Sequence, residues 1–412
     1  MPERKKIGSK HESQREAKNS GRPPQQPVRR TMTTVAVVTD ARPLRVETIG
    51  CEVAFELTPQ ALGLTYWLDV PPKGDPYDVA IRFVGRRLGI RGKSGAGNSF
   101  NQVETIEHVL PGSGPLAITT RVYGIEPGDW HVTSAPTTDA RGARPKAPTF
   151  SAARPRLPKG TASGRTMYAP IVEVSAPGAH RGAWPSLVAL GAGVALATQA
   201  ALAAHAHLPV ASVLGVSFIA CVVGLIGAKA YYMTGHLITG DYHGFRSLVI
   251  GGMCIQGFVL GAIGALVVGA HLSGVPVGPV LDATAPGLLF AMTIGRFGCF
   301  FGGCCAGRPT SSRWGLWSSD RRLGVRRVPS QLLESTVAFT AGLAALLAQL
   351  ARAPSPPGVV FIGAIAAYTL GRQLVFPLRA NPGHTSHGRS VTLTAAGSVL
   401  ALVLAAVVAR RS

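Results

Sequence analysis

The second half of the chain is a series of long apolar stretches separated by short polar segments. Each stretch is about long enough for a helix, which rises about 1.5 Å per residue, to cross roughly 30 Å of hydrocarbon. The pattern therefore predicts an all-α polytopic membrane domain over residues 183–412 with about seven transmembrane helices. These helices are expected near residues 184–206, 208–232, 248–271, 280–302, 331–351, 358–377 and 391–409.

Short runs that alternate apolar and polar residues mark the region from residue 33 to residue 137. Clusters of Gly, Pro, Asp and Asn separate the runs, which is typical of antiparallel strands. We predict a small β-sandwich-like soluble module here. Its role is expected to be structural or interactive, because its sequence shows neither a nucleophile with a base nor a set of metal ligands. The clearest predicted strands are 34–38, 53–57, 64–68, 80–84 and 117–123.

Two further segments show neither pattern. Residues 1–32 mix Lys, Arg, Glu, Gln and Pro with almost no apolar content, so they predict a disordered basic tail. This tail has no apolar centre of the kind found in a signal peptide. Residues 138–182 are rich in Pro, Ala, Arg, Ser and Gly and are interpreted as a linker.

The composition supports a soluble arm joined to a membrane domain. Only 15% of the 412 residues are charged and 46% are hydrophobic, whereas soluble proteins carry about 25% charged residues. An ordinary soluble enzyme and a wholly disordered chain are both disfavoured. The chain has 41 Lys and Arg against 20 Asp and Glu, so its positive excess favours anionic lipid surfaces. Nucleic-acid binding is disfavoured, because no reader motif or aromatic interleaving accompanies the basic residues.

Charged side chains inside or beside the predicted helices are the strongest functional signal. An ionisable group at membrane depth is costly and usually faces the bundle interior or a wet cavity. Arginine suits a phosphate there, because its planar guanidinium donates two parallel hydrogen bonds and stays charged. A lone arginine could equally snorkel to the interface. Two arginines on separate helices favour an anion pocket. The charged positions are Lys229, Arg296, Glu334, Arg372 and Arg379, with Asp282 and Arg308 near helix ends.

Five motifs in this region, taken together and in order, resemble those of the prolipoprotein diacylglyceryl transferase family. They are Gly227-Ala228-Lys229-Ala230-Tyr231-Tyr232, Gly251-Gly252-Met253-x-x-x-Gly257, the arginine signature Gly295 to Gly303, the stretch Arg327-Val328-Pro329-Ser330-Gln331-Leu332-Leu333-Glu334, and Tyr368-x-x-x-Arg372. The Gly-Cys-Phe-x-x-Gly-Cys-Cys version of the arginine signature resembles a divergent branch of that family. The resemblance covers residues 184–409 and does not touch residues 1–180.

The resemblance implies a multi-pass enzyme of the bacterial plasma membrane. Such an enzyme moves the diacylglyceryl group of phosphatidylglycerol to the lipobox cysteine thiol of a prolipoprotein, and it needs no cofactor or metal. Arg296 and Arg372 would then be catalytic and hold the lipid phosphate. The substrate-binding residues implied are Tyr232, Gln256, Arg308, Gln331, Glu334 and Tyr368.

The chain departs from the family pattern at several positions. Gln256 stands where the family carries a histidine that could act as a base, and glutamine takes no proton at neutral pH. His236 and His243, in the loop before the third predicted helix, are candidate replacements or else solvent-exposed loop residues. Cys304 and Cys305 are adjacent and cannot easily close a tetrahedral metal site by themselves. These two thiols and Cys299 are either small packing residues or reactive thiols beside Arg296.

Three functions remain open on the sequence alone. The leading one is the transferase, or a relative that uses another acceptor. A lipid-binding membrane scaffold that lost its base is the second, and Gln256 favours it. A small-anion transporter is the third, although no internal repeat supports it. The basic loop between the fourth and fifth predicted helices suggests a cytoplasmic face, whereas the family topology implies the opposite face, so the orientation stays open.

Overall fold

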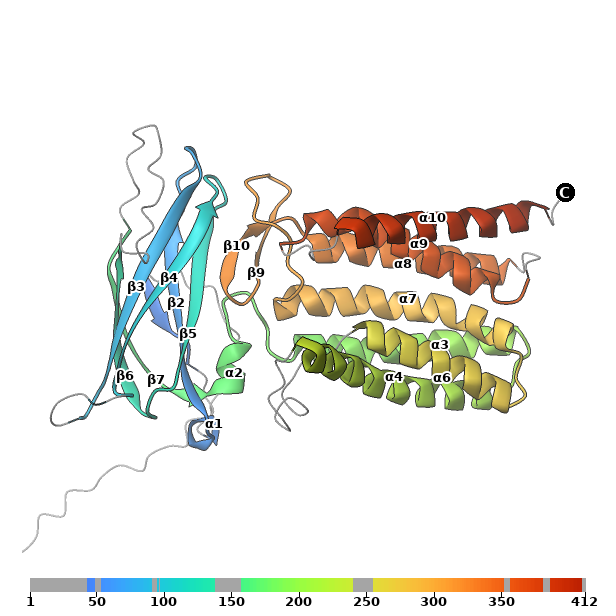
Figure 1. Cartoon of the computed structure of the whole chain (residues 1–412), viewed down its shortest axis with the longest axis horizontal. Coiled ribbons are helices and arrows are strands. Elements are labelled where there is room, and N and C mark those ends of the chain that lie inside the picture. The colour runs from blue at the N-terminus through green and yellow to red at the C-terminus, as the bar shows by residue number, and fades with distance from the viewer. Residues whose placement is uncertain are drawn as a thin grey trace, which may run out of the picture. The chain divides into compact units, whose positions relative to one another are not determined.

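The computed structural model describes residues 43–48, 53–90, 95, 97–137, 157–239, 255–351, 356–380 and 386–409 (Figure 1). These residues all belong to one compact unit, Arg42–Ser412. The predicted basic tail and the strand expected at 34–38 lie outside the described residues.

Helices occupy the second half of the chain, and each overlaps one of the predicted membrane stretches. They are α3 (Ala183–His205), α4 (Val210–Thr239), α6 (Ile255–Leu272), α7 (Val277–Gly302), α8 (Ser330–Leu350), α9 (Val359–Val375) and α10 (Ser386–Ala409). A short helix, η1 (Phe376–Leu378), follows α9.

The helices confirm a multi-pass membrane domain but not the count of seven spans. Five described helices are long and apolar enough to cross a bilayer: Ala183–His205, Val210–Gly235, Val277–Gly302, Ser330–Leu350 and Val359–Leu378. The described parts of α6 and α10 give shorter apolar segments, Gly257–Leu272 and Arg389–Ala405. The prediction of membrane spans is therefore confirmed for these five helices.

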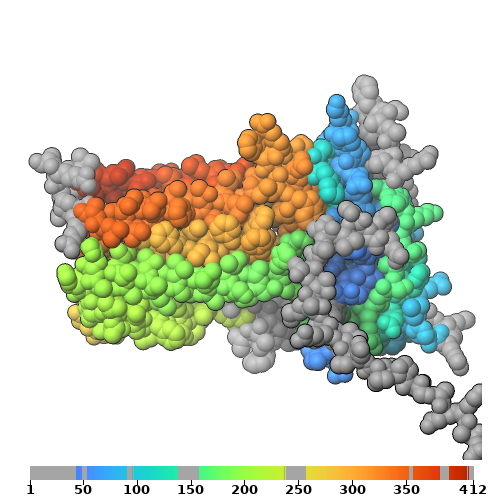
Figure 2. All heavy atoms as spheres, turned by 180° about the vertical axis from the view of Figure 1, so that it is seen from behind, coloured from blue at the N-terminus to red at the C-terminus, as the bar shows by residue number. Residues whose placement is uncertain are grey.

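Helices α7, α8 and α9 share one apolar core. It is formed by Leu289 of α7, Ala338 of α8, and Phe361 and Tyr368 of α9, with smaller alanines between them. The Ser335 hydroxyl of α8 also donates a hydrogen bond to the Thr293 carbonyl of α7 at 3.0 Å. Helix α7 packs on α3 with its other side, and Figure 2 shows its golden surface between green α3 and orange α8. The three helices that share this core therefore fix one another's positions.

Helices α4 and α6 approach each other closely at a pair of glycines. A Cβ atom added to Gly257 would lie 2.2 Å from the Gly227 carbonyl oxygen, and one added to Gly227 would lie 2.5 Å from the Gly257 oxygen. Both distances are far below van der Waals contact, so only glycine fits at this crossing. Small residues allow such close packing between membrane helices.

We expect Gly257→Ala to push α4 and α6 apart and to lower the unfolding free energy by about 1–3 kcal/mol, as overpacking does elsewhere. Thermal unfolding of the detergent-solubilised protein measures this loss. The matched control is Gly264→Ala in the same helix, where an added Cβ meets no atom within 4 Å. Alanine favours a helix over glycine by up to about 1 kcal/mol, so the control should be neutral or slightly stabilising. Equal stability of the two variants would contradict the glycine contact.

The β-rich module consists of two antiparallel sheets. One has the order β1-β2-β5-β10-β9, with β8 also paired to β2, and the other has the order β4-β3-β6-β7. The strands are β1 (Leu44–Val46), β2 (Gln60–Asp69), β3 (Tyr77–Arg87), β4 (Ser99–Val109), β5 (Pro115–Tyr123), β6 (Asp129–Pro136), β7 (Gly160–Arg165), β8 (Met167–Tyr168), β9 (Leu316–Ser319) and β10 (Leu323–Arg327).

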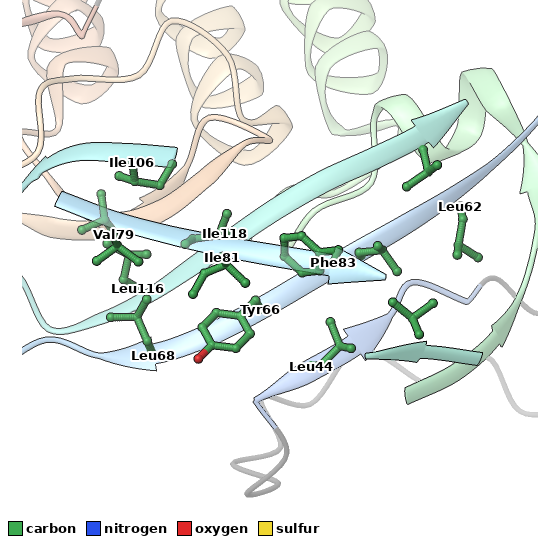
Figure 3. Close-up of a cluster of buried hydrophobic side chains, with 14 of the residues drawn as sticks. Leu44, Leu62, Tyr66, Leu68, Val79, Ile81, Phe83, Ile106, Leu116 and Ile118 are labelled. Carbon is green, nitrogen blue, oxygen red and sulfur yellow. The ribbon is translucent and has the colours of Figure 1, made fainter. Parts of the chain in front are cut away.

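Both sheets contribute to a single apolar core (Figure 3). Tyr66 and Ile118 come from the first sheet, Phe83 and Trp130 from the second, and all four are fully buried. Tyr66 meets Phe83 edge to face, with ring centroids 6.5 Å apart. The alternation of apolar residues in β2, β3 and β5 is the pattern that a sandwich needs, since alternate side chains point to one face.

The prediction of a strand at 53–57 is wrong. Val53–Glu56 forms the short helix α1, and the Gln60 side chain donates hydrogen bonds to the carbonyls of Ala54, Phe55 and Leu57. These bonds satisfy carbonyl groups that a single helical turn leaves without partners. A run of five residues is too short for its alternation to distinguish a strand from such a turn.

Residues 157–182, the described part of the predicted linker at 138–182, also differ from that prediction. Strands β7 and β8 and the helix α2 (Ala169–Glu173) lie there. Strand β7 consists mainly of small residues, and it passes close to β1. A Cβ atom added to Gly164 would lie 2.3 Å from a Val46 methyl group. Gly164, one of the residues behind the linker prediction, is therefore required by close packing.

Strands β9 and β10 come from the segment between α7 and α8, yet they complete the first sheet of the β module. Leu323 and Gly324 of β10 pair with Ile118 and Ala117 of β5. Trp317 of β9 stacks on Trp67 of β2, with centroids 5.7 Å apart and planes 13° apart. The β module thereby fixes the segment that joins the two helices α7 and α8.

One half-buried arginine, Arg121, ties this segment to the rest of the module. Arg121 of β5 donates hydrogen bonds to the carbonyls of Val172 (3.1 Å), Ser175 (2.9 Å) and Arg321 (2.7 Å). It thus joins the residues around α2 to the α7–α8 segment. Hydrogen bonds from a charged donor are worth roughly 1.5–3 kcal/mol each. The β-rich module and the membrane helices are therefore linked by more than the covalent chain.

Candidate functional site

A buried carboxylate lies among three arginines where α7, α8 and α9 meet. Glu334, near the start of α8, has a side chain that is 1% exposed. Arg296 of α7 approaches its Oε2 atom with Nη2 at 2.9 Å. Arg379, just after η1, donates from Nε to Oε1 at 2.6 Å and from Nη2 to Oε2 at 2.7 Å. Arg372 of α9 is farther away, with its Nε atom 3.9 Å from Oε2. We call these four residues the arginine–glutamate cluster.

The cluster carries an excess of positive charge. Three guanidinium groups face one carboxylate, which leaves a surplus of two charges among these four side chains. Burying uncompensated charge is expensive, so a further anion at this place would be strongly favoured. The side chains of Arg296, Arg372 and Arg379 are 16%, 30% and 13% exposed, so Arg372 is the most accessible to a ligand.

Three buried polar atoms in or beside the cluster lack a hydrogen-bond partner within the described part of the chain. They are the Arg372 Nε, the Tyr368 hydroxyl and the Gln331 Oε1 atoms. Leaving such a group unsatisfied costs roughly 1–3 kcal/mol, and buried polar atoms are usually paired with protein, water or ligand. The Tyr368 hydroxyl also interacts electrostatically with Arg296. These donors and the acceptor are suited to a polar molecule held against the arginines.

Helical spacing explains how these side chains reach one place. Tyr368 and Arg372 are four residues apart on α9, and Gln331 and Glu334 are three apart on α8, so each pair shares one helix face. Arg296 lies about two turns before the end of α7 at Gly302. All five residues therefore gather near the ends of their helices, on the side where the α7–α8 segment begins and ends.

The α7–α8 segment is fixed by a fully buried arginine. Arg327 of β10 donates from Nη1 to the Gly307 carbonyl at 3.0 Å and forms an ion pair with Asp320. Burial lowers the pKa of Arg327, although Asp320 opposes this shift. A Cβ atom on Gly307 would lie 1.9 Å from the Val328 carbonyl oxygen, so glycine is required where the start of the segment passes the residue that follows β10.

Backbone hydrogen bonds join the same segment to the residues that carry Arg379. The amide of Arg308 donates to the Leu378 carbonyl, and the amide of Ala380 donates to the Ala306 carbonyl, both at 2.9 Å. The position of Arg379 therefore depends on the segment that follows α7. This is a long-range contact, since the two pieces are about seventy residues apart in the sequence.

Comparison with known protein families identifies this helical region. The family model described as "Prolipoprotein diacylglyceryl transferase" matches residues 183–410, which is more than half of the chain and includes the whole arginine–glutamate cluster. The chain belongs to the prolipoprotein diacylglyceryl transferase family.

Several curated members of the family are similar in sequence. Phosphatidylglycerol–prolipoprotein diacylglyceryl transferase 2 of Streptomyces coelicolor is 35% identical over 205 residues, which are 44% of this chain and 62% of that protein. The transferase of Rhodococcus jostii is 36% identical over 129 residues, 30% of this chain and 36% of that protein. The transferase of a Nostoc species is 31% identical over 173 residues, 39% of this chain and 61% of that protein. The chain thus covers less than two thirds of the length of these relatives.

Of the residues that the family resemblance implies, the structure brings five together. Arg296, Arg372, Glu334, Gln331 and Tyr368 are the residues of the charged site or border it. Arg379 completes the cluster and was noted from the sequence only as a charged position. The sequence did carry a signal for Arg379. The helices contain few carboxylates, so one glutamate among several arginines indicates that the arginines share it as a partner.

The three other implied residues are placed differently. Tyr232 is half-buried on α4, with the Lys229 Nζ atom 5.7 Å from its ring centroid, and α4 packs on α6 and α3. Arg308 has an exposed side chain and contributes its backbone to the α7–α8 segment. Gln256 lies in α6, but its side chain is outside the described residues, as are the side chain of His236 and the whole of His243.

Asp282 has a structural role that the sequence did not reveal. Its carboxylate, on α7, accepts hydrogen bonds from the backbone amides of Gly358 at 2.7 Å and Phe361 at 2.9 Å. These amides belong to the first turn of α9, whose N–H groups have no partner within the helix. Asp282 therefore fixes the start of α9 against α7, at the opposite end of α9 from Arg372.

Proposed function

We propose that this chain transfers the diacylglyceryl group of phosphatidylglycerol to the thiol of a lipobox cysteine in a prolipoprotein, at the bacterial plasma membrane. Its family membership and the names of its relatives support this activity. The observation that carries the proposal is the surplus of positive charge around Glu334 near the end of a membrane bundle. Phosphatidylglycerol is an anionic membrane lipid with one phosphate, which is the ligand that this charge favours.

The reaction places its new charge at the phosphate. The acceptor thiolate attacks the carbon that joins the diacylglyceryl group to the phosphate. A C–S bond forms there, and the C–O bond between that carbon and the phosphate breaks. The electron pair of that bond leaves with the phosphate oxygen, so the diester monoanion becomes glycerol phosphate with an additional negative charge. Guanidinium groups that are already in place stabilise such charge without reorganising. Arg296 and Arg372 are assigned this catalytic role.

Glu334 positions Arg296, and the neighbouring unpaired polar atoms are assigned to the lipid headgroup. Glu334 holds the Arg296 guanidinium at 2.9 Å and binds Arg379 through two parallel hydrogen bonds. The hydroxyl of Tyr368 and the Nε of Arg372 are hydrogen-bond donors for phosphate oxygens, and Gln331 Oε1 accepts from a glycerol hydroxyl. A lipid headgroup thus satisfies each of the three unpaired atoms.

A direct assay tests the proposal. The purified full chain, in vesicles of phosphatidylglycerol with a deuterated diacylglyceryl group, is incubated with a lipobox peptide, and mass spectrometry follows the peptide. We expect the mass of one labelled diacylglyceryl group on the cysteine and release of glycerol phosphate in equal amount. A peptide with serine at that position is the matched control and should stay unmodified. Lipid that co-purifies with a folded but inactive chain would overturn the transferase and favour the membrane scaffold.

A further inference from the structure

Three cysteine sulfur atoms lie together beside the arginine–glutamate cluster. The Sγ atoms of Cys299, Cys304 and Cys305 are all within 4.8 Å of one another. Cys299 is buried in the last turn of α7, and the other two follow the end of that helix. The sequence shows only an adjacent pair with a third cysteine five residues earlier, so the fold is needed to see this grouping.

A tight backbone turn after α7 brings Cys304 and Cys305 back toward Cys299. Gly303 adopts a left-handed conformation with φ 66°, and its amide donates to the Cys299 and Phe300 carbonyls. Cys305 also has a positive φ of 54°, which a non-glycine residue rarely adopts and which strains the backbone. Strain of this kind persists where surrounding contacts impose it.

Contacts from α8 impose this turn. The Gln331 side chain donates a hydrogen bond to the Cys304 carbonyl at 3.0 Å, and the Ser330 hydroxyl donates to the Cys305 carbonyl at 3.4 Å. The cysteine turn is therefore held by the residues that precede Glu334 on the same helix. Arg296 interacts electrostatically with Cys299 and Cys305, and Arg379 with Cys305, so the thiols lie in the positive field of the arginine–glutamate cluster.

We infer that Cys299, Cys304 and Cys305 bind one Zn²⁺ ion through three thiolates, and that the fourth coordination position takes the acceptor thiol. Zn–S bonds of about 2.3 Å in a tetrahedron separate the sulfurs by about 3.8 Å, which suits thiols that already lie within 4.8 Å. Three protein ligands with one open position is the arrangement of catalytic zinc. Thiolates select soft ions, and zinc fits a reaction without electron transfer.

The role of the fourth position rests on the proposed function. A free cysteine has a pKa near 8.5, so its thiol needs help to attack at neutral pH, and Gln256 cannot take the proton. A thiol that coordinates zinc is deprotonated outright. The acceptor would release its proton to water on binding the ion, and the thiolate would then form the C–S bond while the C–O bond breaks. No oxidant or reductant is required.

Metal binding is tested first, on the full chain in detergent. The metal-free protein is titrated with Cd²⁺, whose sulfur charge-transfer absorption counts thiolate ligands, and the zinc form is examined by X-ray absorption. We expect one ion per chain with three sulfur neighbours at about 2.3 Å. Cys299→Ser, Cys304→Ser and Cys305→Ser should each weaken binding roughly 100-fold or more. The control is Cys221→Ser on α4, a free cysteine outside the group, which should bind as the wild type does.

Two outcomes would overturn the site. One is stoichiometric binding that survives all three substitutions, and the other is a native disulfide among these residues, seen as a loss of two hydrogen masses. Cys305→Ser is the safest variant because Cys305 is exposed in the structure. X-ray absorption of the wild type needs no variant at all, so a folding failure does not decide the result.

The acceptor position is tested separately from turnover. Adding a lipobox peptide to the Cd²⁺ form should raise the sulfur absorption by about a third, as a fourth sulfur joins three, whereas the serine peptide should leave it unchanged. An unchanged spectrum with the cysteine peptide, or full transfer by a metal-free Cys305→Ser chain, would overturn this inference only. An increased spectrum with no transfer to the peptide would overturn the proposed function and leave the metal site standing.

Discussion

Glu334→Gln is expected to lower the unfolding free energy by about 3–5 kcal/mol, the cost of removing one partner from a buried ion pair. Glu334 is the carboxylate of the cluster and is 1% exposed, so the glutamine would leave three guanidinium groups without compensation. Its amide would also point two N–H donors toward groups that can only donate. Thermal unfolding of the solubilised protein measures the effect, and transferase activity should fall with it.

Two comparisons make this prediction specific. Asp129→Asn removes a carboxylate from an exposed pair with Arg165, whose side chains are more than half exposed, and should cost less than about 1 kcal/mol. The double variant Glu334→Gln with Arg372→Gln should be more stable than Glu334→Gln alone, because one uncompensated charge is gone. If Glu334→Gln unfolds at the wild-type temperature, the carboxylate does not hold the cluster together.

Arg296→Ala is expected to reduce kcat/KM for transfer by about 10²–10³-fold, the usual effect of removing one donor that stabilises charge in a transition state. Stability should change little, since Glu334 keeps Arg379 and Arg372 as partners and the surplus of positive charge falls by one. Arg296→Lys should recover only part of the rate, because an ammonium group lacks the planar fork of donors. Initial rates in phosphatidylglycerol vesicles measure these changes.

The control for this experiment is another arginine of the same region. Arg313→Ala removes an exposed guanidinium that stacks over Trp314 in the α7–α8 segment, and it should change the rate less than about twofold. A large and equal loss in Arg313→Ala and Arg296→Ala would mean that general attraction of an anionic lipid surface limits the rate. A loss confined to Arg296→Ala assigns the effect to the cluster.

The sequence determined the architecture of the membrane half. In the described part of the chain each of the seven apolar stretches overlaps a helix, because an apolar segment of this length satisfies its backbone hydrogen bonds internally as a helix. Five of these helices also meet the length and hydropathy of a membrane span in the part of the chain that is described. Arg296, Glu334 and Arg372 stood out for the same reason, since a charge in an apolar stretch is costly and easily noticed.

Only the tertiary structure decided how distant segments combine. Strands β9 and β10 are short, and β7 is a run of small residues, so their stability comes from neighbours that local pattern does not contain. Arg379 binds Glu334, which lies 45 residues away in the sequence. Cys299 lies beside the adjacent pair Cys304 and Cys305 only because the chain makes a left-handed turn between them. Hydropathy can be read from each segment alone. A carboxylate shared by three arginines, or three thiols within 4.8 Å of one another, exists only after the segments have packed together. The sequence therefore selected most of the charged residues, and the fold assembled them into a site.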